Sequence, residues 1–220
     1  MLKTQSNLDR LRSEQKQQVD ARREAIITAA QQLFLEKGIT EISMRDIAEG
    51  ATINRATLYR YFPDRHPLTF EVAARMLEKI ATVSSREVDE NVGFEQATRT
   101  ILMGMIHSFD ELIDAYRYIG MFDQLYGRAY PTEELAKEYQ EKIFEIFGRL
   151  ASAPLDSIPS EKFAQLITVT NTIMSFLEKM AGRGELMGGE QGVPMQIQIE
   201  QFEQMINLII DQFLFASREK

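Results

Sequence analysis

The sequence predicts an all-α protein with a small N-terminal domain of three helices followed by a larger helical domain. Apolar residues recur at three- and four-residue spacing along most of the 220 residues, which is the period of an amphipathic helix. No segment of the sequence alternates apolar and polar residues as a half-buried strand does. The expected boundaries are a flexible tail over residues 1–17, a first domain over 18–65 and a second domain over 66–220.

The first two helices follow from an apolar stripe and a capping pattern. Residues 19–37 carry apolar side chains at helical spacing, and Gly38 follows them as a common helix stop. Ser43 stands three residues before Asp46 in a Ser-x-x-Asp arrangement, which is typical of a helix start. A second helix of about two turns is therefore expected after Ser43.

The third helix is short and has one inward face. Asn54 can cap it, it begins at Arg55, and Pro63 ends it because proline cannot continue a helix. Leu58 and Phe62 lie four residues apart, so we expect them to face the second helix from the inside.

The second domain is predicted to hold six longer helices. Asp64 can cap the first, which runs to about Val83 with Pro67 in its first turn. The other five are separated by breaks that contain glycine, proline or serine, and the last two carry wide apolar stripes. They are expected near residues 94–107, 109–119, 132–150, 160–181 and 195–217.

Charge divides the chain in the same place. The net charge is -8, but residues 1–66 hold eleven Lys and Arg against nine Asp and Glu, while the remainder holds fourteen against twenty-four. An N-terminal part that tolerates phosphates, joined to an acidic body, favours nucleic-acid contact at one end only. The chain has no cysteine and no apolar run near the ~18 residues that a membrane-spanning helix needs, so we expect a cytoplasmic protein without membrane insertion.

Two short helices joined by a tight turn describe a helix-turn-helix, whose second helix enters the major groove of DNA. Arg55 can contact guanine and Thr57 can reach a base edge, while the small Ala56 allows close approach. Hydroxyl and guanidinium groups one turn later can bind phosphates. The predicted DNA-binding residues are Ser43, Arg45, Asn54, Arg55, Ala56, Thr57, Tyr59, Arg60, Tyr61 and Arg65.

The run ISMRDIAEGATINRATLYRYFPDRHPL, residues 42–68, resembles the DNA-binding signature of the tetracycline-repressor (TetR) family, and the resemblance extends back to about Arg22. That family often has glycine in the turn where this chain has Thr52, so the turn must accept a side chain here. The resemblance implies a homodimer that pairs through helices near 160–181 and 195–217, with a ligand-binding domain before them. The two wide apolar stripes suit such a four-helix interface, although burial inside one monomer would also explain them.

The resemblance places a ligand pocket in the middle of the chain, where methionine and aromatic residues are frequent. Each of them has a core role as the simpler explanation, but together they suggest an adaptable apolar cavity. One of the acidic residues Asp110, Glu111, Asp114 and Asp123 could turn inward and pair with a cationic lipophile. The predicted ligand-binding residues are Met105, Phe109, Tyr116, Phe122, Tyr126, Phe147 and Met174.

The expected function is a ligand-responsive transcriptional repressor, released from a palindromic double-stranded DNA operator by a small, largely apolar effector. No metal or other cofactor is expected, because His66 and His107 lie in different predicted helices and the chain has no cysteine. No enzyme is expected, because the common hydrolase, phosphate-loop and zinc-protease motifs do not occur. A helical ligand-binding or adaptor protein without DNA activity, and an enzyme, remain the alternatives.

Overall fold

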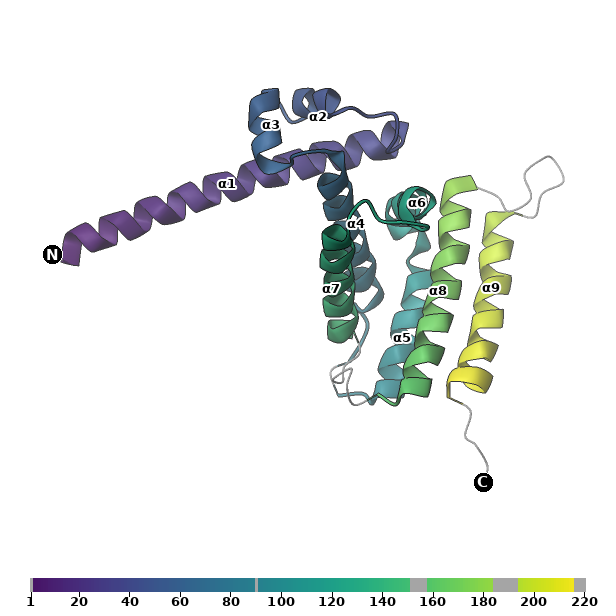
Figure 1. The fold of residues 1–220 in the computed structure, drawn as a ribbon. Coiled ribbons are helices and arrows are strands. Elements are labelled where there is room, and N and C mark those ends of the chain that lie inside the picture. The colour runs from purple at the N-terminus through teal and green to yellow at the C-terminus, as the bar shows by residue number, and fades with distance from the viewer. Residues whose placement is uncertain (1, 90, 151–157, 184–193, 216–220) are drawn as a thin grey trace. The chain divides into compact units, whose positions relative to one another are not determined.

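The structure, a computed structural model, describes residues 2–89, 91–150, 158–183 and 194–215, and these residues form helices and no strands (Figure 1). The all-α prediction is confirmed. The chain divides into two compact units, Met1–Val72 and Ala73–Lys220, with the boundary inside α4 rather than before it. The helices are α1 (Leu2–Lys37), α2 (Met44–Gly50), α3 (Arg55–Tyr61), α4 (Arg65–Ser84), α5 (Phe94–His107), α6 (Phe109–Tyr126), α7 (Glu133–Leu150), α8 (Ser160–Arg183) and α9 (Met195–Ile209), the last followed by a π-helical turn (Ile210–Leu214).

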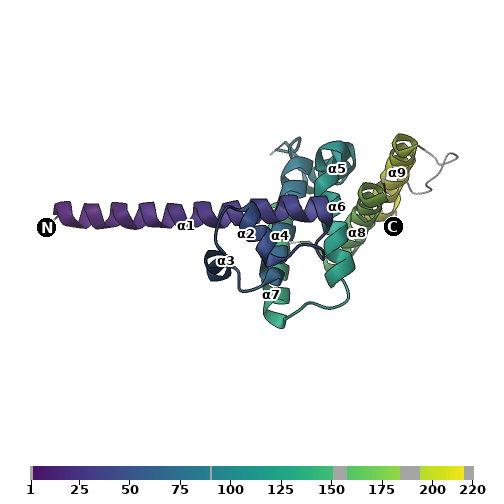
Figure 2. The same ribbon diagram turned by 90° about the horizontal axis from the view of Figure 1, so that it is seen from above.

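The first unit is built around the C-terminal half of α1, against which α2 packs, and α3 packs on α2 (Figure 2). Its core side chains are almost fully buried, and Leu58 and Phe62 are among them as predicted. On α1, Arg23 forms a two-point ion pair with Glu71 of α4 at 3.0 and 3.1 Å, and its guanidinium lies 5.3 Å from the centre of the Phe62 ring. These contacts join α1 to the start of α4 within the unit.

The segment expected as a flexible tail is helical. Residues 2–17 continue α1 without a break, and the described side chains from Arg12 to Arg22 are exposed. Helix-favouring Gln, Glu, Arg and Lys are frequent there, so the backbone can stay helical without an apolar face. Figure 2 shows this part of α1 extending past α2 and α3 of its own unit.

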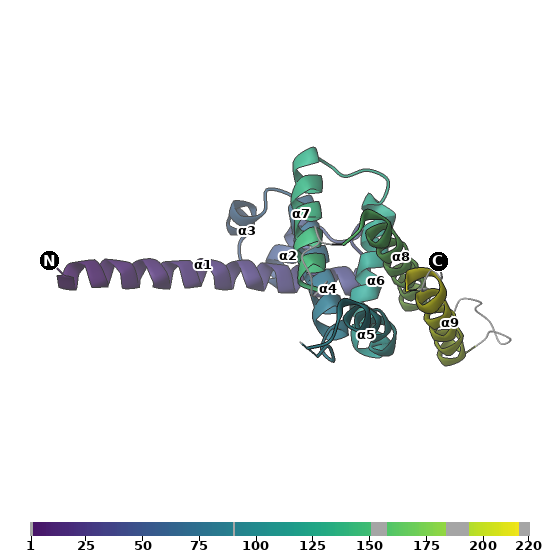
Figure 3. The ribbon, with the colours of Figure 1, turned by 90° about the horizontal axis from the view of Figure 1, so that it is seen from below.

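The second unit is a bundle in which α6 packs extensively on α8, and α5 and α9 also contact α8 (Figure 3). Helix α6 continues to Tyr126, beyond the predicted end at residue 119, because Gly120 does not break it. A Cβ atom at Gly120 would lie 3.4 Å from the Cβ of Glu178, so this glycine lies at the contact between α6 and α8.

Candidate nucleic-acid interface and cavity

Helix α2 begins with the predicted cap. The backbone N–H and hydroxyl of Ser43 donate to the Asp46 carboxylate at 2.9 and 2.6 Å, and the Asp46 backbone N–H donates to the Ser43 hydroxyl at 3.3 Å. These hydrogen bonds hold the pKa of Asp46 below its ordinary value. The capping box therefore fixes where α2 starts, and with it the approach to the turn.

The turn between α2 and α3 depends on an unusual residue. Thr52 has φ +54°, the one non-glycine residue in the left-handed region within the described part of the chain. Its N–H donates to the Glu49 carbonyl at 3.1 Å, and the N–H of Ile53 donates to the Ala48 carbonyl at 2.9 Å. These two bonds form a Schellman motif, which closes α2 and normally uses glycine at the left-handed position. The expectation that this turn accepts a side chain is confirmed.

Helix α3 presents its first turn outward. Arg55 and Ala56 are exposed, Thr57 is half-buried, and one turn later Tyr59 is 50% exposed beside an exposed Arg60. Within the described residues, neither arginine has a hydrogen-bond or ion-pair partner. An exposed helix start with unpaired guanidinium groups can contact base edges and phosphates.

Several predicted DNA-binding side chains already have partners in the protein. Arg65 donates to the carbonyls of Ile39 and Thr40 at 3.1 and 3.2 Å, so it ties α4 to the loop after α1. The Asn54 side chain accepts the backbone N–H of Thr57 at 2.8 Å and caps α3.

The remaining predicted DNA-binding residues also include side chains that already have partners within the protein. Ser43 is occupied by its cap, and Arg45 pairs with Glu49 at 2.7 Å on the surface of α2. Tyr61 is half-buried at the end of α3. Of the predicted DNA-binding residues, Arg55, Ala56, Tyr59 and Arg60 are exposed without a side-chain partner in the described structure, and Thr57 is half-buried.

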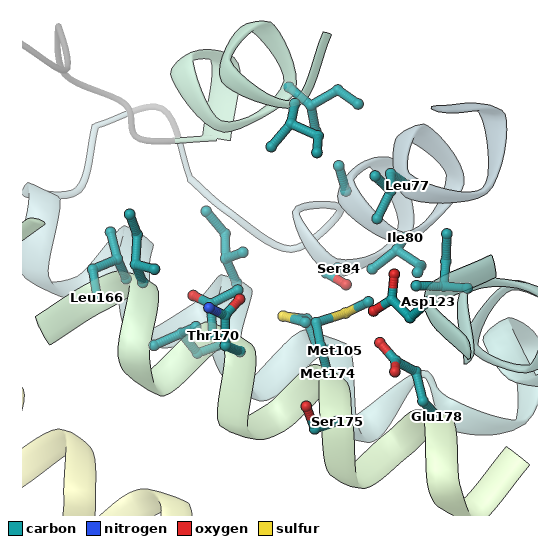
Figure 4. A pocket seen from close by; sticks show the side chains of 18 of the residues that line it. Leu77, Ile80, Ser84, Met105, Asp123, Leu166, Thr170, Met174, Ser175 and Glu178 are labelled. Atoms are coloured by element: carbon teal, nitrogen blue, oxygen red, sulfur yellow. The ribbon is translucent and has the colours of Figure 1, made fainter. Parts of the chain in front are cut away.

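The second unit contains a cavity of about 460 Å³, a size that suits a small organic molecule (Figure 4). Side chains from α4, α5, α6, α7 and α8 line it, together with Tyr130 from the loop before α7. Most are apolar. Figure 4 shows Met105 and Met174 between the Leu166 end and the end that holds Asp123 and Glu178.

Only part of the predicted ligand set lines this cavity. Met105 and Met174 do, but four predicted aromatic residues do not and are buried elsewhere in the unit. Tyr116 stacks on Phe109 with ring centres 6.0 Å apart and donates its hydroxyl to the Met105 carbonyl at 2.9 Å. Phe122 packs on Tyr126 with ring centres 5.0 Å apart.

These four aromatic residues have core positions because helical packing, not residue type, decides which side chains face a cavity. The last predicted ligand residue, Phe147, has a side chain that lies outside the described part of the structure.

Two carboxyl groups face each other in the cavity. Figure 4 shows Asp123 of α6 and Glu178 of α8 directed toward one another. Burial raises the pKa of Asp123, and burial together with the Asp123 charge raises the pKa of Glu178 to about 8. Asp123 keeps access to solvent at the cavity edge, while Glu178 is half-buried. At neutral pH the pair therefore tends to share one proton.

The sequence prediction included Asp123 among four candidate acids but missed Glu178, Ser84 and Tyr139. Periodicity offered a signal for Glu178. Counting back in steps of four along α8 from this residue reaches Met174 and Thr170, which also line the cavity. A carboxylate that continues an apolar stripe is the pattern that marks an inward-facing charge.

A metal site and a membrane-spanning helix each require features that the described residues lack. Within them, no group of three or more His, Cys, Asp or Glu side chains is placed to hold a metal ion. Within the same residues, no helix has the length and apolar character needed to cross a bilayer.

Comparison with known proteins places the resemblance in the same region as the exposed helix. Residues 26–72 match the sequence family described as bacterial regulatory proteins, tetR family. The chain is 31% identical over 88 residues to the HTH-type transcriptional regulator EthR of Mycobacterium tuberculosis, which covers 40% of each chain. It is also 31% identical over 67 residues to the HTH-type transcriptional repressor Rv1474c of Mycobacterium tuberculosis, covering 30% of this chain and 36% of the repressor. The chain thus matches less than half the length of these relatives.

Solved structures extend the likeness of the fold along the chain. A crystal structure of a TetR transcriptional regulator from Rhodococcus sp. RHA1 has a TM-score of 0.60 and covers 89% of this chain and 99% of its own. Only 15% of the aligned residues are identical, so this likeness concerns the fold.

Proposed function

Because residues 26–72 match the sequence family described as bacterial regulatory proteins, tetR family, we propose that the chain is a transcriptional regulator of this family that binds a palindromic DNA operator through α3. A small effector that binds in the cavity of the second unit releases the protein from DNA, so the protein acts as a repressor. It does so in the cytoplasm. Catalysis has no part in this proposal.

The exposed first turn of α3 is the observation that carries the proposal. Arg55 and Arg60 project from the unit without protein partners, and the capping box and the Schellman motif fix the helices before them. In a helix-turn-helix, such a turn reads bases while neighbouring side chains bind phosphates and set the register. Arg55 is proposed as the base reader, and Tyr59 and Arg60 as phosphate ligands.

A homodimer would present two such helices to one duplex. Large apolar side chains remain exposed on α8, α9 and the π-helical turn, including Ile167, Ile197, Met205, Leu208 and Phe213. Exposed apolar residues on adjacent helices favour association with a second apolar surface. We propose that the partner is a second copy of the chain, whose twofold symmetry requires a palindromic operator.

Helix α4 offers a route from effector to DNA. Its residues Leu77, Ile80 and Ser84 line the cavity, while Glu71 near its start pairs with Arg23. A ligand that favours one position of α4 would change the separation of the two α3 helices in the dimer. The ligand shifts the population only by its difference in affinity between the two states.

The test is a selection of random DNA duplexes with the purified chain, followed by affinity measurements at several salt concentrations. We expect one palindromic sequence to be enriched, with an affinity that falls steeply as salt rises because phosphate contacts release counterions. Arg55→Ala should cost about 1–3 kcal/mol and relax the base preference at one position per half-site. Tyr59→Phe should weaken binding evenly across sequences. Arg128→Ala, an exposed arginine in the second unit, is the charge-matched control.

Two outcomes contradict the proposal. The first is that no duplex is enriched, or that affinity does not depend on salt, which favours a helical binding protein without DNA activity. The second is that the Arg55 and Arg128 variants lose the same amount of affinity, because then α3 contributes only charge. A base preference unchanged by Arg55→Ala would remove this residue from the reading set.

A further inference from the structure

The cavity carries an unbalanced charge. Asp123 and Glu178 both line it, and the described lining residues include no Lys, Arg or His. Neither carboxyl has a hydrogen-bond or ion-pair partner among the described side chains. Glu178 is half-buried and loses part of its hydration in this largely apolar space, so a cation or a proton close to the exposed Asp123 and to Glu178 would offset their mutual repulsion.

A second observation concerns a buried hydroxyl group in the wall of the same cavity. Ser84, at the end of α4, is 2% exposed, and its hydroxyl has no hydrogen-bond partner in the described structure. Figure 4 shows this side chain on the cavity wall beside Met105, between the Leu166 end and Asp123. Buried hydroxyl groups nearly always have a partner, so an unpaired one that lines a cavity is available to a ligand or to a water molecule there.

The rest of the wall is largely apolar. Ile101, Leu102, Leu166 and Met174 contribute to it, with Thr98, Thr170 and Asn171 among its polar members. A ligand that matches both parts needs an apolar body and one polar end. The methionine side chains can adjust to the shape of that body without a large cost.

We propose that the effector of this cavity is a lipophilic organic ammonium, with its cationic nitrogen between Asp123 and Glu178 and an N–H donated to the Ser84 hydroxyl. This inference rests on the proposed role of the cavity as the effector site. The cation replaces the proton that the two carboxyl groups share, and that proton passes to solvent. The positive charge then offsets the repulsion between the carboxylates, and the carboxylates compensate the cation for the hydration that it loses. A neutral ligand would leave the pair as it is, and an anion would add a third negative charge.

The experiment measures binding of three ten-carbon probes to the full chain by calorimetry at pH 7, without DNA. Decylamine, 1-decanol and decanoate share one apolar chain and differ in a positive, neutral or negative head. We expect decylamine to bind at least about tenfold more tightly than decanol, because a charge-assisted hydrogen bond is worth about that much, and decanoate to bind most weakly.

Variants test the two carboxyl groups directly. Asp123→Asn and Glu178→Gln should each reduce the affinity for decylamine, and the double variant should abolish its advantage over decanol. Decanol should bind the variants as tightly as the unmodified chain, which also shows that they are folded. Glu161→Gln, on the exposed part of α8 and absent from the cavity lining, is the matched control and should keep the preference.

The proposal is overturned if decanol or decanoate binds the unmodified chain as tightly as decylamine, or if the double variant keeps the preference for the cation. Both results are independent of DNA. An ammonium-selective cavity in a chain that enriches no duplex would refute the DNA-binding proposal alone. A sequence-specific DNA binder without cation preference would refute the cation proposal alone.

Discussion

The two units place their candidate functional side chains in opposite surroundings. In the first unit, Arg55 and Arg60 are exposed, and short-range caps hold the helix that carries them. In the second unit, Asp123 and Glu178 face a cavity whose wall comes from five helices and a loop. The first arrangement depends on the local backbone, and the second depends on how closely distant helices pack.

This difference predicts different responses to substitution. A change on α3 should alter binding while leaving the folding of its unit nearly intact, because exposed side chains contribute little to stability. A change beside the cavity should alter both, because cavity residues are also packing residues. The substitutions below compare how the stability of the two units responds, from tight packing in the second unit to the turn before α3 in the first.

The largest effect is expected for Gly104→Ala in α5. A Cβ atom at this position would lie 2.3 Å from the Ser84 carbonyl oxygen of α4 and 3.1 Å from its Cα, so backbone must move. Alanine gains about 1 kcal/mol in helix propensity, but overpacking against backbone outweighs it, and we expect a net loss of about 3 kcal/mol in unfolding free energy. Thermal unfolding followed by circular dichroism measures the change, and decylamine affinity should fall with it because Ser84 is displaced.

Gly182→Ala in α8 is the control for that experiment. No atom of the described residues lies within 4 Å of the Cβ that it would add, so this substitution should be neutral or slightly stabilising through helix propensity alone. Equal stability changes at the two glycines would mean that α4 and α5 separate easily, and the contrast between the units would lose its packing basis.

The features that were predicted correctly from the sequence are mostly local ones, whereas those that depend on the packing of distant helices were predicted only in part. The all-α fold and the caps of α2 and α3 were predicted because each depends on neighbours within a few residues. The family resemblance indicated that the turn must accept the Thr52 side chain, and the structure adds that this residue is left-handed. Of the ligand residues, Met105 and Met174 line the cavity, whereas Tyr116 and Phe122 are in the core.

The reason lies in the geometry of helical packing. Residue type favoured aromatic side chains for the ligand site, but facing a cavity depends on where one helix crosses another. That crossing is not encoded in any short stretch. The role of Arg65 was missed for the same reason, since its carbonyl partners on Ile39 and Thr40 are distant in sequence.

The next largest effect that we expect is a change of unfolding free energy with pH, caused by the cavity carboxyl group of Glu178. Glu178 has a folded-state pKa of about 8 against an ordinary 4.5, so between these values the native state holds a proton that the unfolded state releases. Stability should therefore be fully present below about pH 4.5 and decline as pH rises through 8. The loss should be roughly 2 kcal/mol after a discount for solvent screening of a half-buried group.

Thermal unfolding of the unmodified chain and of Glu178→Gln from pH 5 to 8.5 measures this dependence, which the variant should flatten. Among the described residues, the titratable groups that interact with this carboxyl are Asp123 and Tyr116 of α6, Tyr139 of α7 and Lys179 of α8, and Tyr130 interacts with Asp123. All three tyrosine pKa values are raised, so the tyrosines stay neutral in this range. A variant as pH-dependent as the unmodified chain would show that Glu178 is hydrated and does not belong to the cavity wall.

The smallest effect, and one of opposite sign, is expected for Thr52→Gly in the first unit. A β-branched residue in the left-handed region costs about 1–2 kcal/mol of stability, and glycine would remove this cost. Part of the gain is lost again because glycine gives the unfolded chain more conformational freedom. We expect a net stabilisation of roughly 0.5–1 kcal/mol, with Thr52→Asn between the two, measured by urea unfolding. Gly38, with φ +92° at the end of α1, offers the reverse experiment, because Gly38→Ala should lose a similar amount. Operator affinity should stay unchanged in Thr52→Gly, since the Schellman bonds of the turn use only backbone atoms; a fall in affinity without a fall in stability would mean that the Thr52 side chain itself contacts the DNA.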